Sequence, residues 1–191
     1  MRVVQTSLPE VLIVEPPVFR DDRGSFCESW NEAGFAAALN AISHPAPRRF
    51  VQDNHSVSKA AVLRGLHYQL PPHAQGKLVR VVRGSAFDVA VDIRRGSPTF
   101  GRWAGSLLSA DNGRQMWLPE GFAHGFLALE DDTHFLYKTT DFYARECERS
   151  LAWNDPTLAI DWPVPAGMTP LIAPKDAAAP RWDEAELPTI A

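Results

Sequence analysis

The sequence predicts an all-β protein, built as a sandwich or barrel of antiparallel strands. Between residues 77 and 143, short apolar stretches alternate with clusters of turn residues. Strands at such close spacing are typical of sandwiches and barrels, and no long helical pattern separates them as it would in βαβ units. The chain has 191 residues, enough for one domain with a substantial core, so we expect residues 1–191 to form a single domain.

The N-terminal part of the chain contains a predicted edge strand and a predicted helix. The apolar alternation between residues 3 and 14 indicates a strand that needs a neighbour at its edge. Asn31 is a favourable N-cap, and the nine residues after it, EAGFAAALN, place Phe35 and Leu39 on one helical face.

The central strands follow one another across short turns. The stretch 77–83 ends at Gly84, and the stretch 86–93 directs Phe87, Val89, Val91 and Ile93 to one side and Asp88, Ala90 and Asp92 to the other. We expect the two aspartates to be structural and to meet arginine partners or solvent. Arg94 and Arg95 beside Gly96 are typical of a solvated turn.

The C-terminal part of the chain is predicted to form an ordered arm. Prolines multiply after Asp155, and the only helix expected there is a short one around residues 176–180. Trp153, Trp162 and Trp182 require apolar surroundings, so we expect the arm to pack against the strands.

Composition excludes several classes of protein. A net charge of −4 and a pI near 5.8 argue against a surface that coats nucleic acid or anionic lipid. The two cysteines, Cys27 and Cys147, form no disulfide framework, which favours a reducing compartment. No apolar run is long enough for a signal peptide or a membrane span. We therefore expect a soluble, cytoplasmic protein with no nucleic-acid and no membrane partner.

One strand carries residues that a core does not need. The stretch VLRGLHYQ, residues 62–69, has the pattern of a buried strand, yet it holds Arg64 and His67. A fixed cation and a titratable base three residues apart indicate a site rather than a scaffold.

The segment GRQMWLPEGFAH, residues 113–124, resembles the second sequence motif of the cupin superfamily. The resemblance implies an antiparallel double-sheet, or jelly-roll, barrel with His124 pointing inward. Metal-binding cupins add two histidines and a glutamate, whereas the corresponding stretch here, His67-Tyr68-Gln69, offers one histidine and no nearby carboxylate. Metal sites require three or four ligands, so we expect no metal and no other cofactor.

Further motifs closely resemble the dTDP-4-dehydrorhamnose 3,5-epimerase family over nearly the whole chain. They include DDRGSFCES, FVQDNHS, AQGKLVR, FLYKTTDFY and APKDAAAP, in this order. The resemblance implies a cupin-type barrel that binds a dTDP-linked 4-keto-6-deoxy sugar and inverts C3 and C5 without a cofactor. It assigns His67 as the base, Asp176 as its tautomer-fixing partner, Lys77 as the cation for the enolate oxygen and Tyr137 as the acid on the opposite face.

The same resemblance implies a substrate-binding set and a quaternary structure. The set consists of Phe19, Arg23, Phe26, Glu28, Gln52, Asn54, Arg64, His124, Glu148 and Lys175. His124 belongs there with the residues at the nucleotide end. Family members are homodimers that exchange N-terminal strands, so Arg23 and Glu28 are expected to contribute to the partner's pocket.

Three alternative functions remain open on the sequence alone. One is an epimerase acting at C3 only, or a ketoisomerase, on a related dTDP-sugar; Lys77 and Tyr137 favour double epimerisation over it. Another is a non-catalytic sugar-binding cupin, which would have no use for the four catalytic candidates together. The third, a metal-dependent cupin oxygenase, lacks the necessary ligands.

Overall fold

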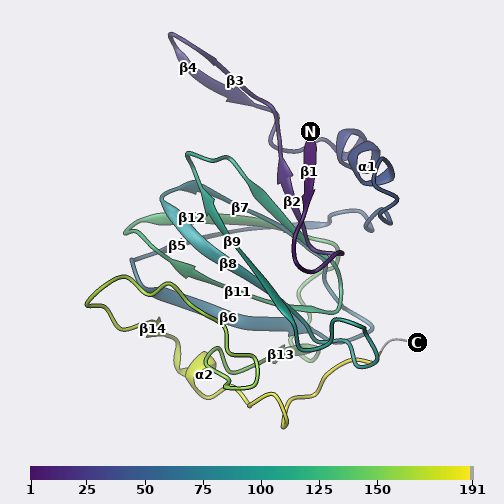
Figure 1. Cartoon of the computed structure of the whole chain (residues 1–191), viewed down its shortest axis with the longest axis vertical. Coiled ribbons are helices and arrows are strands. Elements are labelled where there is room, and N and C mark those ends of the chain that lie inside the picture. The colour runs from purple at the N-terminus through teal and green to yellow at the C-terminus, as the bar shows by residue number, and fades with distance from the viewer. Residues whose placement is uncertain (190–191) are drawn as a thin grey trace.

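The computed structural model describes residues 1–189, in which two antiparallel sheets face each other (Figure 1). The first sheet has the order β1 (Arg2–Gln5), β2 (Leu12–Glu15), β10 (Gln115–Leu118), β7 (Lys77–Arg83), β12 (Thr133–Thr139) and β5 (Gln52–Ser58). The second has the order β13 (Glu148–Ser150), β6 (Val62–Gln69), β11 (Phe122–Ala128), β8 (Ser85–Asp92) and β9 (Trp103–Ser109), with β14 (Leu171–Ile172) parallel to β6. The predicted all-β double-sheet fold is confirmed.

The core between the two sheets contains a large apolar cluster. Val79 from β7 and Phe135 from β12 meet Ala90 and Phe126 from the second sheet, and the rings of Phe126 and Phe135 stack with centroids 4.0 Å apart. This packing fixes the distance between the sheets, so residues at the more polar end of the same strands are held at a defined separation.

Strand β8 is buried on both faces. Val89 and Val91 lie in a second apolar cluster on the outer side, which includes Trp162 of the C-terminal arm, while Ala86 and Ala90 lie in the core between the sheets. The predicted division of this strand into two faces is confirmed. It means that any acid on the inner face of β8 is enclosed by protein.

The predicted helix is present as α1 (Glu32–Asn40), and the Asn31 side chain accepts a hydrogen bond from the backbone N–H of Gly34 at 2.9 Å. Phe35 and Leu39 pack in a third cluster with residues of β2 and β10. The helix therefore covers the first sheet near the N-terminus.

The predicted solvated turn after β8 is wrong for Arg94. Its side chain is only 15% exposed and forms ion pairs with Asp92 at 2.8 Å and Glu10 at 2.6 Å. Sequence neighbours could not indicate Glu10, which approaches from a distant loop. Asp92 has the arginine partner that the sequence predicted.

The predicted single strand between residues 3 and 14 is two strands. β1 folds back onto β2 in antiparallel register, with Val3 opposite Val14, and β1 forms the edge of the sheet. The turn between them is stabilised by Thr6, whose hydroxyl donates to Leu8 O and Val11 O at 2.9 Å.

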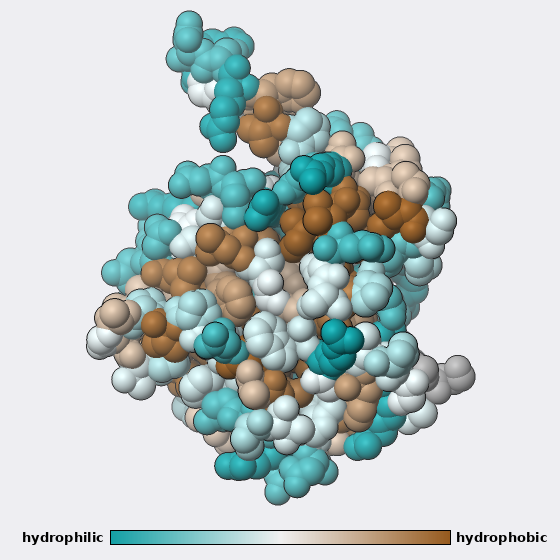
Figure 2. Space-filling view, viewed as in Figure 1, coloured by the Kyte–Doolittle hydropathy of each residue, from teal (hydrophilic) through white to brown (hydrophobic). Residues whose placement is uncertain are grey.

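A hairpin of β3 (Val18–Asp21) and β4 (Gly24–Cys27) stands clear of the barrel (Figures 1 and 2). Phe19 and Phe26 are 62% and 68% exposed on it, and Arg23 bonds only with Asp21 of its own turn among the described residues. Large apolar side chains on an isolated hairpin indicate a surface that another molecule covers.

The C-terminal arm, drawn in green and yellow, runs along the second sheet (Figure 1). It carries α2 (Pro174–Ala177), which begins two residues before the predicted stretch 176–180 because Pro174 suits the first helical turn. Trp162 Nε1 donates to Trp153 O at 2.9 Å, and Trp182 packs on Phe100, so the predicted order of the arm is confirmed. Neither helix of the described chain has the length and apolar composition to cross a membrane.

Candidate active site

A cavity of about 330 Å³ lies between the two sheets, beside α2. Both sheets and the arm contribute to its wall, which contains the following side chains singled out from the sequence: Arg64, His67, Lys77, His124, Tyr137, Lys175 and Asp176. All four catalytic candidates therefore line one cavity.

The first element of the cavity is a hydrogen-bonded pair of His67 and Asp176. His67 lies on β6, and α2 of the arm brings Asp176 against it, with His67 Nε2 2.6 Å from Asp176 Oδ1. The other oxygen, Oδ2, accepts from the backbone N–H of Gly65 at 3.2 Å. Burial is the largest single influence on the pKa of Asp176 and acts to raise it, but the interactions with His67, the Gly65 N–H and the charge of Lys175 together outweigh burial, and the pKa is lowered.

An ionised carboxylate only accepts hydrogen bonds, so the shared proton belongs to His67 Nε2. The neutral ring then keeps its lone pair on Nδ1. Asp176 thus fixes the tautomer in which His67 can remove a proton through Nδ1.

Lys77 supplies a cation from the facing sheet. Its side chain is buried, and its Nζ donates to the backbone carbonyl of His67 at 3.4 Å. Burial lowers the pKa of Lys77 to about 8, against the opposing effect of Asp88 and Glu148. An ammonium group buried away from solvent stabilises a nearby oxyanion more strongly than it would in water.

Tyr137 lies on β12, in the sheet opposite His67. Burial raises the pKa of its phenol, so the side chain is a neutral donor at pH 7. Its hydroxyl makes no hydrogen bond within the described part of the chain and is available to a molecule in the cavity.

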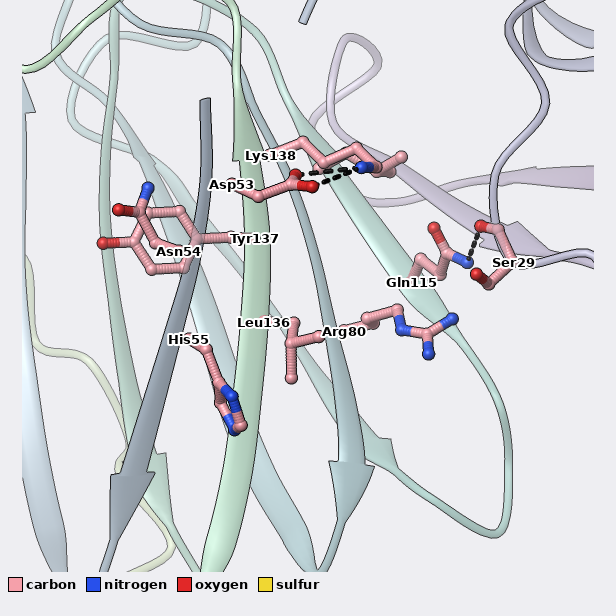
Figure 3. A pocket seen from close by; sticks show the side chains of 10 residues that line it. Ser29, Asp53, Asn54, His55, Arg80, Gln115, Leu136, Tyr137 and Lys138 are labelled. Carbon is pink, nitrogen blue, oxygen red and sulfur yellow. Dashed lines mark hydrogen bonds and ion pairs between the residues drawn. The ribbon is translucent and has the colours of Figure 1, made fainter. Parts of the chain in front are cut away.

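The strands β5 and β12 direct alternate residues to opposite sides of the first sheet (Figure 3). Asn54 and Tyr137 point to one side, whereas His55 and Leu136 point to the other. A second cavity of about 230 Å³ lies at this sheet, where Lys138 forms an ion pair with Asp53 at 2.9 Å. Leu136 and Lys138, the sequence neighbours of Tyr137, therefore do not line the first cavity.

His124 and Asp88 form a second hydrogen-bonded pair. His124 on β11 lies opposite His67 in the strand register, and its Nε2 is 2.7 Å from Asp88 Oδ1. The family resemblance grouped His124 with the nucleotide end, but it lies beside the proposed base.

The prediction that Asp88 meets arginine or solvent is wrong. Its side chain is fully buried between the sheets and bonds with a histidine. The pattern of the strand did place it on the inner face, and an acid enclosed by protein must have a partner. The identity of that partner depends on strand pairing, which the sequence does not show.

Further polar candidates gather around the cavity. Glu148 on β13 forms an ion pair with Lys175 at 2.7 Å and accepts from the Tyr143 hydroxyl at 3.0 Å. Burial acts to raise the pKa of Glu148, but these two hydrogen bonds and the nearby positive charge, chiefly that of Lys175, together lower it. Arg64 is held by Ser58 at 3.2 Å.

Gln52 and Asn54 lie together on β5. The Gln52 amide donates to Asn54 Oδ1 at 3.0 Å and its carbonyl accepts from the backbone N–H of Tyr143 at 3.2 Å. Neither belongs to the wall of the first cavity, although β5 pairs with the strand that carries Tyr137.

The remaining substrate-binding candidates are not brought to the cavity of their own chain. Phe19, Arg23 and Phe26 lie on the projecting hairpin, and Glu28 follows it as an exposed residue. None of them lines the first cavity. Within residues 1–189, no group of three or more histidine, cysteine or acidic side chains is arranged to hold a metal ion.

Comparisons with known proteins agree over nearly the full chain. The sequence model of the dTDP-4-dehydrorhamnose 3,5-epimerase family matches residues 5–184. A dTDP-4-dehydrorhamnose 3,5-epimerase from Pseudomonas aeruginosa is 57% identical over 92% of this chain and 93% of its own.

Solved structures are equally similar. The dTDP-6-deoxy-D-glucose-3,5-epimerase from Legionella pneumophila, in complex with dTDP-4-keto-L-rhamnose, is 47% identical with a TM-score of 0.91, covering 100% of this chain and 98% of its own. A 3'-monoepimerase from Streptomyces bikiniensis, in complex with dTDP-quinovose, is 36% identical with a TM-score of 0.85, covering 99% and 93%. The sequence match and the shared barrel together show that the chain belongs to the dTDP-4-dehydrorhamnose 3,5-epimerase family.

Proposed function

We propose that this chain converts dTDP-4-dehydro-6-deoxy-D-glucose to dTDP-4-dehydro-L-rhamnose, the epimerisation of C3 and C5 in dTDP-L-rhamnose biosynthesis. The observation that carries the proposal is the single cavity in which a base, a cation and a neutral acid come from two facing sheets. The high identity to epimerases that act at both carbons supports the same reaction.

The chemistry begins with the acidity of the carbons beside the 4-ketone. His67 Nδ1 removes the proton from C5 or C3, and the electron pair of the broken C–H bond moves toward O4 as an enolate forms. Lys77 stabilises the negative charge on O4, so the carbon acid ionises at neutral pH. Asp176 stabilises the imidazolium that results.

Inversion requires that a proton return to the opposite face of the enolate. Tyr137 comes from the sheet facing His67, so we assign its hydroxyl as this donor. Exchange with water restores the proton of Tyr137 and removes that of His67, and the sugar is isomerised without oxidation or reduction. Repetition at the second carbon completes the reaction.

The remaining residues would hold the nucleotide diphosphate. Arg64 and Lys175 line the cavity and offer cations to phosphate oxygens. We assign the reaction to the cytoplasm, where the free thiols of Cys27 and Cys147 stay reduced.

The reaction can be tested by incubating the protein with dTDP-4-dehydro-6-deoxy-D-glucose in D2O and following C3 and C5 by NMR. A 3,5-epimerase introduces deuterium at both carbons and yields the L-configured product. Deuterium at C3 alone would identify a monoepimerase, as the Streptomyces bikiniensis relative is described. No deuterium at either carbon would contradict catalysis altogether.

We further propose that the working form is a homodimer in which the β3–β4 hairpin of one subunit completes the cavity of its partner. The exposed Phe19 and Phe26 offer stacking faces for a thymine base, and Arg23 offers a cation for phosphate. Light scattering at micromolar concentration should give the mass of two chains, and a monomer would contradict the proposal.

Complementation between two inactive variants tests the exchange. One subunit carries His67→Asn and an intact hairpin, and the other carries Arg23→Ala with Phe26→Ala and an intact cavity. Mixed dimers, purified through two different tags, should recover about half of the wild-type activity, because one of their two symmetric sites is complete. If each hairpin serves its own barrel, both sites of the mixed dimer are defective and activity stays absent.

Removal of metals provides a separate prediction. Exhaustive chelation should leave epimerase activity unchanged, because the proposed base, cation and acid are all side chains of the protein. Activity is measured before and after dialysis against EDTA, with metal content determined by mass spectrometry. Loss of activity that one divalent ion restores would show that the proposed proton-transfer set is incomplete.

A further inference from the structure

Asp88 is the most enclosed acid beside the cavity. It lies on the inner face of β8 with no exposed surface, and Oδ1 accepts the hydrogen bond from His124. Its second oxygen, Oδ2, is buried and has no hydrogen-bond partner in the described chain. A buried carboxylate oxygen without a partner destabilises a fold, so this arrangement calls for an explanation beyond packing.

One effect of Asp88 is on the tautomer of His124. Burial raises the pKa of Asp88, and His124 and Lys77 oppose that rise by favouring its ionised form. The ionised carboxylate holds the proton on His124 Nε2, which leaves Nδ1 as the ring nitrogen available to the cavity. Burial lowers the pKa of His124, and the charge of Lys77 acts in the same direction, against the opposing attraction and hydrogen bond of Asp88. The neutral ring therefore presents a lone pair, which suits the hydroxyl hydrogen of a sugar.

A second effect is on the charge of Lys77. Asp88 is the largest influence that opposes the loss of the Lys77 proton on burial. The other charged or titratable groups around the two residues are His67, Arg64, Tyr137, Glu148, Lys175 and Asp176. Two of these groups are acids, and each already has a partner: Glu148 pairs with Lys175, and Asp176 pairs with His67. Asp88, in contrast, has a buried carboxylate oxygen without a hydrogen-bond partner in the described chain.

We propose that Asp88 is a positioning residue of the epimerase site, which keeps Lys77 cationic and holds His124 as a hydrogen-bond acceptor for a hydroxyl of the substrate sugar. The proposal rests on the proposed epimerase function. Asp88 itself touches no reacting atom and acts through these two neighbours.

The same strand provides a matched control. Asp92 lies on the same face of β8 and is equally buried, but Arg94, Ser97 and Thr99 all donate to its carboxylate. Substitution of either acid by asparagine preserves its shape and removes one buried charge, but only Asp88 bonds with His124 and acts on the charge of Lys77.

The test compares Asp88→Asn with Asp92→Asn. Asp88→Asn should lower kcat by about 10- to 100-fold and leave the affinity for dTDP unchanged, because dTDP carries no hexose hydroxyl. The activity of the wild type should fall as pH rises through the pKa of Lys77, about 8 in the free protein. Without its counter-charge Lys77 loses its proton more readily, so the fall should begin at lower pH, by about one pH unit. Asp92→Asn should lower the Tm without changing the pH at which activity falls.

Nitrogen NMR of the wild-type histidines tests the same proposal without a variant. The His124 ring should be protonated at Nε2 and unprotonated at Nδ1 between pH 6 and 8. An Nδ1–H tautomer, an unchanged pH profile in Asp88→Asn, or an equal shift in Asp92→Asn would overturn the role of Asp88. If instead the wild type introduces no deuterium into the sugar, the proposed function fails while the NMR experiment still decides the His124 tautomer.

Discussion

Replacing His67 by asparagine should abolish deuterium uptake at both C3 and C5 while the protein still binds dTDP. The asparagine side chain is polar and can still bond with Asp176, but it offers no basic nitrogen, so the carbon acids cannot ionise. The rate of exchange should fall on the order of 10³-fold or more, as expected when a positioned general base is lost. Exchange is followed by NMR in D2O, and dTDP affinity by calorimetry.

His55→Asn is the matched control for this variant. His55 lies on the outer side of the first sheet, where its Nε2 is 3.1 Å from His134 Nδ1. Its loss should leave exchange at both carbons at the wild-type rate. Persistent exchange in His67→Asn would show that another group is the base, and loss of dTDP binding would show that the substitution disturbs the whole cavity.

Replacing Tyr137 by phenylalanine should separate proton removal from inversion. The substitution removes one hydroxyl, so His67 and Lys77 still form the enolate and His67 can return the proton that it took. Deuterium uptake without inversion should continue, whereas net inversion should fall about 10²-fold or more, as for loss of a general acid. The two rates are obtained from one NMR time course.

Tyr68→Phe controls for the loss of a buried tyrosine hydroxyl. The Tyr68 hydroxyl donates to Glu186 O at 2.8 Å in the C-terminal arm, so its loss should affect stability and leave inversion intact. Inversion at the wild-type rate in Tyr137→Phe would mean that water or a different side chain delivers the proton.

Much of the fold follows from local patterns. Asn31 and the residues after it predicted α1 with its N-cap, and alternation in β8 predicted which side chains lie on each of its faces. These features depend on residues close in sequence, for which helix capping and strand periodicity are direct guides.

The pairing of distant residues was accessible only through family resemblance. His67 and Asp176 lie 109 positions apart in the sequence, and the C-terminal arm that carries Asp176 has no periodic pattern. The errors at Asp88 and Arg94 have the same origin, because each side chain is satisfied by a partner on another segment, His124 and Glu10 respectively. Strand pairing and loop packing decide such contacts, and a single sequence does not record them.

The projecting β3–β4 hairpin has a consequence for how the protein responds to dilution. If the hairpin of one subunit covers the nucleotide of the other, each bound dTDP contacts two chains, and ligand binding is thermodynamically linked to association. The nucleotide then strengthens the dimer by the same factor by which dimerisation strengthens nucleotide binding. Specific activity should therefore decline as the protein is diluted, and added dTDP should shift the onset of dissociation to lower protein concentration.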